Sequence, residues 1–184
     1  MKKLLVLLTL LCVSLSSWAY SFSVGGIYYN ITSSTSPYKV AVTYASTSYN
    51  SYSGSVTIPT TVTNAGITYS VTSIGSMAFT GCRGLTSVSI PSSITNIGSE
   101  SFSDCTSLTS FSIPSAVTSI GINAFYGCNS LVSINIPSSV ILISGGAFGS
   151  CSALITVDAA NLYYSSLNGV LYNKKQTLLI QCPT

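Results

Sequence analysis

The chain has 184 residues, enough for one domain, and 47% of them are apolar, which is enough for a sizeable core. Charged residues make up only 5% of the chain, against about 25% in ordinary globular proteins, so serine and threonine must keep its surface soluble. The absence of histidine removes the usual general base and the commonest zinc ligand, and the absence of a basic cluster argues against nucleic acid as a partner.

Residues 1–19 are predicted to be a signal peptide. Lys2 and Lys3 precede an apolar run from Leu4 to Leu15, and Ser17 and Ala19 provide the small residues of a cleavage site. The run is about a dozen residues long, shorter than the ~20 that cross a bilayer, and no later segment is longer. We therefore expect cleavage after Ala19, a secreted or cell-surface protein, and no transmembrane segment in the mature chain.

Residues 20–54 are predicted to form an N-terminal β cap. The segment from Phe22 to Ile31 alternates apolar and polar residues on either side of Gly25-Gly26, which predicts a hairpin with the glycine pair as its turn. The same alternation continues from Val40 to Tyr44.

A degenerate repeat is expected next, with its strand ending at Ile58. The interval from Ile58 to Ile74 is 16 residues, whereas the corresponding interval from Ile90 to Ile97 is 7. This difference predicts a nine-residue insertion around Asn64 to Thr72.

Residues 55–160 are predicted to form a repeat array, because apolar residues recur every 23 positions. The unit reads I-G-x-x-A-F-x-G-C-x-x-L-x-S-V-x-I-P-x-S-V-x-x. A unit this short cannot bury its own apolar residues, so the copies are expected to stack around a shared interior. The predicted interior columns are Ile74, Ile97, Ile120 and Ile143; Phe79, Phe102, Phe125 and Phe148; Cys82, Cys105, Cys128 and Cys151; Leu85, Leu108, Leu131 and Leu154.

Each copy is predicted to contain one short strand and one short helical turn. The alternation from Leu85 to Ile90 is typical of a half-buried strand, and the proline that follows ends it because proline has no N–H for the ladder. The segment around Ala78-Phe79 is too short for a full helix and is interpreted as one helical turn or a bend. Glycine after the column isoleucine, at Gly75, Gly98 and Gly121 but not at Ser144, predicts a bend with positive φ.

Residues 161–184 are predicted to be a C-terminal β-hairpin cap. Asn168-Gly169 is a strong turn signal between the apolar segments Leu162 to Tyr164 and Val170 to Tyr172. The chain stops soon after Ile180, which is expected either of a short protein or of a truncated one.

The repeat unit closely resembles the BspA-like (Treponema-type) class of leucine-rich repeats. The resemblance covers Ser55 to Asp158 and extends to the flanking segments Val24 to Tyr29 and Asn168 to Lys174. It implies a right-handed solenoid with strands on the concave side. It also implies a secreted or surface protein of host-associated bacteria or protists, of which several relatives are adhesins for host or bacterial proteins.

The polar positions that face outward on the predicted strands form the candidate binding face. They make two columns of short hydroxyl and amide groups, suited to protein or glycan contact, although such residues also serve simply to keep a strand soluble. The columns are Thr57, Ser87, Ser89, Ser110, Ser112, Ser133, Asn135, Thr156 and Asp158. Tyrosines outside the interior columns would anchor an interface, chiefly Tyr44, Tyr49, Tyr52, Tyr126, Tyr163 and Tyr164.

The remaining polar chemistry predicts no catalytic, cofactor or metal site. The only carboxylates are Glu100, Asp104 and Asp158, which the repeat does not place as a catalytic pair. The cysteine column converges on no single point, so it is not expected to bind metal. A disulfide ladder stays open for an exported protein, but buried free thiols fit the rung spacing better. Cys182 has no assigned partner.

Two functions of different kinds remain. The first is an adhesin-like binding protein that contacts host extracellular or bacterial surface proteins, or glycans, through the solenoid surface without catalysis. The second is a structural spacer, or part of a longer repeat protein, without a ligand of its own. A hydrolase is a distant third reading.

Overall fold

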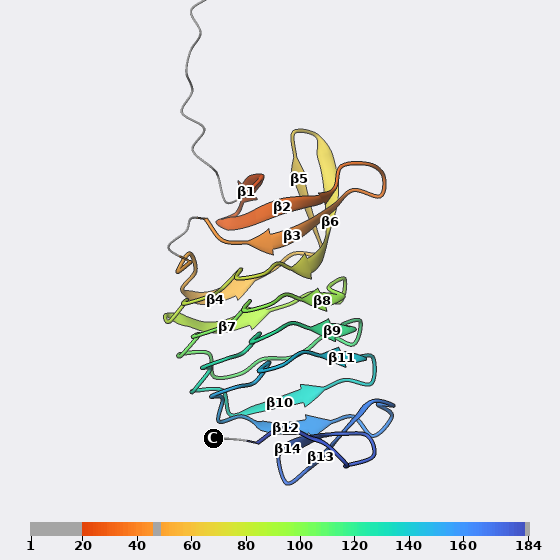
Figure 1. Cartoon of the computed structure of the whole chain (residues 1–184). Helices are drawn as coiled ribbons and strands as arrows, with labels where there is room; N and C mark the ends of the chain where they lie inside the picture. Colours follow the sequence, from red (N-terminus) through yellow and green to blue (C-terminus); the bar gives the residue numbers. More distant parts are fainter. Residues whose placement is uncertain (1–19, 46–48, 183–184) are drawn as a thin grey trace, which may run out of the picture.

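The computed structural model describes residues 20–45 and 49–182, so the predicted signal peptide lies outside the described residues. The described part contains fifteen β-strands and no helix, which confirms a mainly β fold. Figure 1 shows the strands of successive copies lying one above another as rungs of a stack. Within these two ranges there is no helix with the length and apolar character needed to span a bilayer.

The N-terminal block is an antiparallel unit of three strands, β1 (Phe22–Val24), β2 (Ile27–Ser33) and β3 (Lys39–Thr43). The turn between β1 and β2 consists of Gly25 and Gly26, with φ of 60° and 79°, so the predicted hairpin is confirmed. β3 pairs in parallel with β6 (Ile67–Ile74), and the block is therefore continuous with the repeat array.

The predicted insertion forms most of a second hairpin. β5 (Thr61–Asn64) pairs antiparallel with β6 and turns at Ala65-Gly66, where φ is 48° and 78°. The extra residues thus form a hairpin that lies beside the N-terminal block, where β5 contacts β1 (Figure 1).

One side of the stack carries the strands predicted from the alternating segments. β4 (Gly54–Thr57) pairs in parallel with β7 (Leu85–Ser89), and β10 (Ser133–Ile136) pairs in parallel with β12 (Leu154–Val157). Residues 108–113 of the intervening copy form no strand, so the prediction of a strand there is wrong.

The interrupted copy has a phenylalanine where its neighbours have valine or isoleucine. The ring of Phe111 packs edge-on against those of Phe102 and Phe125, with centroid distances of 4.9 and 4.8 Å. A phenylalanine ring needs more room than a β-branched side chain. We therefore attribute the absence of a strand at residues 108–113 to Phe111. Within the described residues, two long backbone bonds join this segment to its neighbours, from Thr109 N–H to Thr86 O (3.4 Å) and from Val132 N–H to Thr109 O (3.3 Å).

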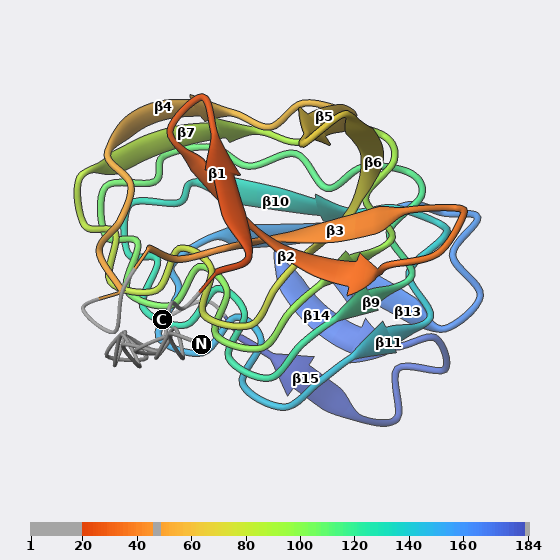
Figure 2. The same cartoon turned by 90° about the horizontal axis from the view of Figure 1, so that it is seen from above.

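A second side of the stack carries a row of short strands that the sequence pattern did not predict. β8 (Asn96–Ile97), β9 (Ser119–Ile120) and β11 (Leu142–Ile143) continue in parallel from β6, each 23 residues after the last. Figure 2, which looks down the stack, shows this row and the row containing β4 and β10 on different sides of the molecule.

A third row of hydrogen bonds runs where helical turns were predicted. The N–H groups of Met77 and Phe79 donate to the carbonyl oxygens of Ser99 and Ser101 in the next copy, at 2.9 and 2.7 Å, and the pattern recurs in later copies. The segment is a chain of turns and contains no helix, so the predicted helical turns are not found here. Two residues per copy have φ between 50° and 71°: Met77, Glu100, Asn123 and Gly146, and Gly81, Asp104, Gly127 and Ser150.

The prediction of positive φ at Gly75, Gly98 and Gly121 is also wrong. None of the three has positive φ, and they are needed for a different reason. A Cβ on Gly98 would lie 2.6 Å from the backbone nitrogen of Ser76, and one on Gly121 would lie 2.4 Å from that of Ser99. Glycine therefore lets the backbones of successive copies approach closely at this point.

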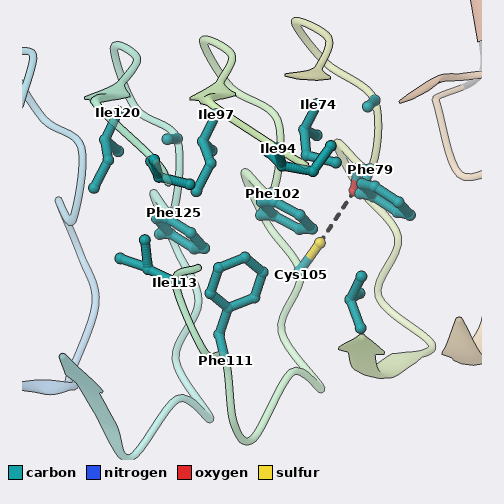
Figure 3. Packing of buried hydrophobic residues seen from close by; sticks show 14 of the residues in the cluster. Ile74, Phe79, Ile94, Ile97, Phe102, Cys105, Phe111, Ile113, Ile120 and Phe125 are labelled. Atoms are coloured by element: carbon teal, nitrogen blue, oxygen red, sulfur yellow. Dashed lines mark hydrogen bonds between the residues drawn. The ribbon is translucent and has the colours of Figure 1, made fainter. Parts of the chain in front are cut away.

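The interior consists of the predicted columns with two exceptions, both in the last copy. In the isoleucine column every residue is buried except Ile143, which is partly buried. Every residue of the phenylalanine and cysteine columns is buried. The rings of Phe79, Phe102, Phe125 and Phe148 stack nearly parallel, with successive centroids 4.9, 5.3 and 5.5 Å apart. Figure 3 shows three of these rings in line beneath the isoleucine column.

Leu154 is the second exception, because the last strand is shifted by two residues. β12 pairs with β10 as Ser133 with Leu154 and Ile134 with Ile155, an offset of 21 residues instead of 23. Leu154 is consequently 53% exposed, and Ile155 is buried in the interior position. The prediction that Leu154 is a core residue is therefore wrong.

The C-terminal block is a three-stranded antiparallel sheet of β13 (Tyr164–Leu167), β14 (Val170–Asn173) and β15 (Leu179–Gln181). Asn168 and Gly169 form the turn between the first two strands, with φ of 51° and 81°, as predicted. The sheet lies beside β12, at the end of the stack opposite to β1 (Figure 1).

Candidate binding face

Two rows of short polar side chains run along the side of the stack that carries β4, β7, β10 and β12. Eight of the nine predicted face residues lie in these rows, and all of the eight are exposed except Ser87, which is partly buried. We call this surface the serine face; it consists of Ser55, Thr57, Ser87, Ser89, Ser110, Ser112, Ser133, Asn135 and Thr156.

Ser55 belongs to the serine face but was not predicted. It pairs with Ser87 across β4 and β7, and the Ser87 hydroxyl donates to the Ser55 hydroxyl at 2.9 Å. Its position two residues before Thr57 on the same strand was the signal that could have identified it, because alternate residues of a strand point to the same side.

Asp158 does not belong to the serine face. Its N–H donates to Ile136 O at 2.9 Å, and its carboxylate accepts from the N–H of Ala160 at 2.9 Å, which caps the turn after β12. The two-residue shift of β12 explains this, because Thr156 takes the place next to Asn135 that the spacing gave to Asp158, and the Thr156 hydroxyl donates to Asn135 Oδ1 at 3.1 Å.

The centre of the serine face is hollowed into an open groove of about 690 Å³. It lies over the copy that lacks a strand. Its apolar lining comes from Val88, Ile90, Phe111 and Pro114. Its polar lining is made of serine hydroxyls, from Ser87, Ser89, Ser92, Ser110, Ser112, Ser115 and Ser133.

The groove contains no charged side chain among its lining residues. A ligand that brought a charge into it would lose solvation without gaining an ionic partner. Hydroxyl groups both donate and accept hydrogen bonds, so the groove suits a ligand with many neutral polar groups.

A second hollow of about 310 Å³ adjoins the N-terminal end of the serine face. It lies between the Gly25-Gly26 turn and β4, and Ser55 and Thr57 line it together with Ser51 and Ser53. The β1–β2 turn therefore borders the candidate face, which the sequence pattern did not indicate.

Two of the six predicted anchor tyrosines are in the interior. Tyr52 is 6% exposed, its ring packs at a tilt against that of Phe79 with the centroids 4.6 Å apart, and its hydroxyl donates to Thr43 O. Tyr164 is also buried, and its hydroxyl accepts from the N–H of Ile143 at 2.8 Å. Both tyrosines complete the core at the ends of the array, so the prediction that they lie outside the interior is wrong. Tyr52 nevertheless lines the second hollow.

The other four tyrosines remain accessible to different degrees. Tyr44 and Tyr49 are partly buried and pack against each other at 4.8 Å, whereas Tyr126 and Tyr163 are exposed. None of the four lines the groove.

The cysteine column consists of free thiols in the structure. The thiols of Cys105 and Cys128 each donate to a carbonyl oxygen of the preceding copy, Phe79 O and Phe102 O, at 3.1 Å. Figure 3 shows the bond from Cys105. Burial raises the pKa of Cys128 to about 12 and also raises that of Cys105. The thiols are therefore neutral packing groups, in keeping with the preferred prediction; Cys182 is exposed.

The carboxylates are dispersed over the described part of the chain. Glu100 and Asp104 occupy the two left-handed positions of one turn segment, and Asp158 lies at the end of β12. Among residues 20–45 and 49–182, no group of three or more histidine, cysteine or acidic side chains is arranged to hold a metal ion.

Comparison with known proteins relates the chain to bacterial repeat proteins. Residues 47–176 match six copies of the BspA type leucine rich repeat region. A leucine-rich repeat protein from Bacteroides ovatus is 34% identical, with a TM-score of 0.66 over 81% of this chain and 42% of its own. One from Bacteroides capillosus is 28% identical, with a TM-score of 0.63 over 75% of this chain and 98% of its own.

A leucine-rich repeat protein from Treponema pallidum shares the fold at 22% identity and a TM-score of 0.54, over 74% of this chain and 70% of its own. A comparison with curated proteins found no match. The chain thus spans less than half of the Bacteroides ovatus protein and almost all of the Bacteroides capillosus one.

Proposed function

Because the chain belongs to the BspA-type leucine-rich repeat family, we propose that it is an extracellular or cell-surface binding protein that holds host or bacterial surface proteins, or glycans, on its serine face without catalysis. The observation that carries this proposal is the open groove of about 690 Å³ at the centre of that face. Its volume lies within the range of ~300–1,000 Å³ that is usual for ligand sites.

Three further features support the proposal. The leader sequence of residues 1–19 favours export. The solenoid is proposed to be right-handed, with the serine face on its concave side, where a bound ligand would make the most contacts. Seven of the nine side chains of the face project from β4, β7, β10 and β12 rather than from loops, so little ordering of these residues is needed on binding.

A double variant, Ser89→Arg with Ser112→Arg, tests the function because two long charged side chains would fill the groove. The matched control is Ser34→Arg with Ser76→Arg, two exposed serines outside the serine face. Binding would be measured by biolayer interferometry against extracellular matrix proteins and a glycan panel. We expect at least one ligand at micromolar concentration, a loss of affinity of about tenfold or more in the groove variant, and no change in the control.

The spacer hypothesis is the second candidate, and the length of the Bacteroides ovatus relative favours it. It predicts that neither the unmodified chain nor the variants bind any member of the panel. Binding that is identical in the groove variant and the control would contradict the role of the serine face while leaving a binding function in place.

A further inference from the structure

The serine hydroxyls that line the groove are short of hydrogen-bond partners. Seven serines line it, and of these the Ser87 hydroxyl donates to the Ser55 hydroxyl. The other six have no side-chain hydrogen bond within the described part of the chain: Ser89, Ser92, Ser110, Ser112, Ser115 and Ser133. On the side of β8 and β9, by contrast, the hydroxyls of Ser93 and Thr118 donate to carbonyl oxygens of the preceding copy, at 2.7 and 3.2 Å. The groove hydroxyls are therefore available to a ligand.

The second hollow continues this polar surface toward the N-terminal end of the stack. Ser55 lines this hollow and pairs with Ser87, which lines the groove. Thr57 and Ser89 pair in the same way, two residues further along the strands. From Ser55 to Ser133 the surface crosses three rung spacings of ~4.8 Å, or about 14 Å in all. A chain-like ligand that lies along the stack would contact both hollows.

Both hollows are electrically neutral, because neither has a charged side chain in its lining. A carboxylate or sulfate group on a ligand would lose its hydration there without gaining an ionic partner. Apolar side chains such as Val88, Phe111 and Pro114 lie among the groove hydroxyls. This combination matches a neutral glycan, whose sugar rings carry hydroxyl groups at their edges and C–H groups on their faces.

The features that hold a protein partner are missing from the two hollows. Protein interfaces are anchored chiefly by tryptophan, tyrosine and arginine, and Tyr52, which is buried, is the one residue of these types in either lining. A peptide that joined the sheet would need an open strand edge. Residues 108–113 lie between β7 and β10, and Thr109 is hydrogen-bonded to both neighbouring copies, so neither strand offers such an edge at the groove.

We propose that the serine face binds a neutral glycan chain, which lies along the stack from the groove into the second hollow. This inference rests on the proposed function and narrows its ligand to one class. Serine hydroxyls both donate and accept, so they can bond to sugar hydroxyls in either sense, while the C–H faces of the rings cover the apolar lining. Because the contacts are spread over both hollows, affinity rises with chain length until both are filled.

The test compares hexasaccharides that differ in charge. Cellohexaose, maltohexaose, mannohexaose and chitohexaose are the neutral probes, and hexasaccharides of hyaluronan and heparin are the charged ones. Binding to the secreted chain would be measured by isothermal titration calorimetry. We expect at least one neutral hexasaccharide to bind with a Kd below about 1 mM, and at least about tenfold more tightly than its disaccharide and than either charged probe.

A pair of alanine substitutions tests the contribution of the groove hydroxyls. Ser89→Ala with Ser112→Ala removes two of them and should weaken binding of that neutral hexasaccharide about tenfold, as expected for the loss of two hydrogen bonds. The matched control is Ser34→Ala with Ser76→Ala, two exposed serines outside the serine face, and it should leave the Kd unchanged.

A second pair tests whether the glycan reaches the second hollow. Ser53→Ala with Thr57→Val removes two hydroxyls from its lining and should reduce the gain in affinity of the hexasaccharide over the disaccharide. Circular dichroism and thermal unfolding would show that all three pairs keep the fold, since every substituted side chain is exposed.

The outcomes separate this inference from the proposed function. A matrix protein that binds the unmodified chain but not the groove variant Ser89→Arg with Ser112→Arg, with no neutral hexasaccharide bound, would keep the proposed function and overturn the glycan chain. Equal affinities for neutral and charged hexasaccharides, or for the groove alanine pair and its control, would also overturn it. A chain that binds neither proteins nor glycans would contradict both.

Discussion

Ser101 occupies a position at which the other copies have Ala78, Ala124 and Ala147, and its side chain is fully buried. Its hydroxyl has no hydrogen-bond partner in the structure. A buried hydroxyl without a partner loses its hydration and destabilises the fold by ~1–3 kcal/mol. Ser101→Ala should therefore raise the free energy of unfolding by about 1 kcal/mol, as a higher midpoint in urea with an unchanged m-value.

The reverse substitution is the control for this prediction. Ala124→Ser places the same hydroxyl in the equivalent buried site one copy later, so it should lower the urea midpoint. A stability unchanged by Ser101→Ala would mean that the hydroxyl is already satisfied, for example by a buried water.

The positions with positive φ in the turn segments could not be predicted from residue type alone. Asn123 and Asp104 are types that tolerate positive φ, but Met77 and Glu100 are not, so composition alone could not identify the position. The N–H groups of these residues donate to carbonyl oxygens of the next copy, so their conformation belongs to the contact between copies. Only the stacked arrangement reveals that constraint.

At the scale of strands, the recurring columns predicted the stacking and the interior but not every register. A shift of two residues leaves the same alternate side chains of Leu154 to Val157 facing the core and changes only the residue that each one pairs with, so the alternation fits both registers. The spacing of 23 favoured the wrong one, since it cannot show that the last strand begins two residues early. The serine face was predictable because its residues follow the regular spacing of the repeat, including Ser110 and Ser112, which lie on no strand. The groove was not predictable, because it depends on one bulky ring, Phe111.

Contact between copies is most sensitive to volume at the column glycines. A Cβ on Gly121 would lie 2.4 Å from the backbone nitrogen of Ser99, too close for any atom pair, and the backbones would have to separate. We expect Gly121→Ala to lower the free energy of unfolding by about 1–3 kcal/mol in urea titrations, a typical effect of overpacking.

Gly145 is the matched control, because a Cβ added there meets no heavy atom within 4 Å and its φ is not positive. Gly145→Ala should stabilise the chain by about 0.4–1 kcal/mol, since alanine has less freedom in the unfolded state. Equal effects of the two substitutions would show that the close approach at Gly121 can relax.

For the whole molecule, the scarcity of charge determines how stability responds to pH. The chain has no histidine and three carboxylates, so little should titrate between about pH 6 and 8. Folding is then driven by burial of the stacked columns and by three rows of hydrogen bonds between copies. Stability should be flat across this range and should depend little on salt.

Above pH 9 the buried thiols change this behaviour. Burial raises the pKa of Cys128 from an ordinary value of 9.0 to about 12, so between these values the thiol ionises in the unfolded chain but not in the folded one. The free energy of unfolding is therefore unaffected by this thiol below pH 9. As the pH rises from 9 toward 12 it falls by up to about 1.4 kcal/mol per pH unit because of Cys128. Urea midpoints at pH 8, 9 and 10 should fall progressively, and Cys128→Ala should make that fall shallower. A midpoint that does not change up to pH 10 would mean that the thiols are not free, as in a disulfide ladder.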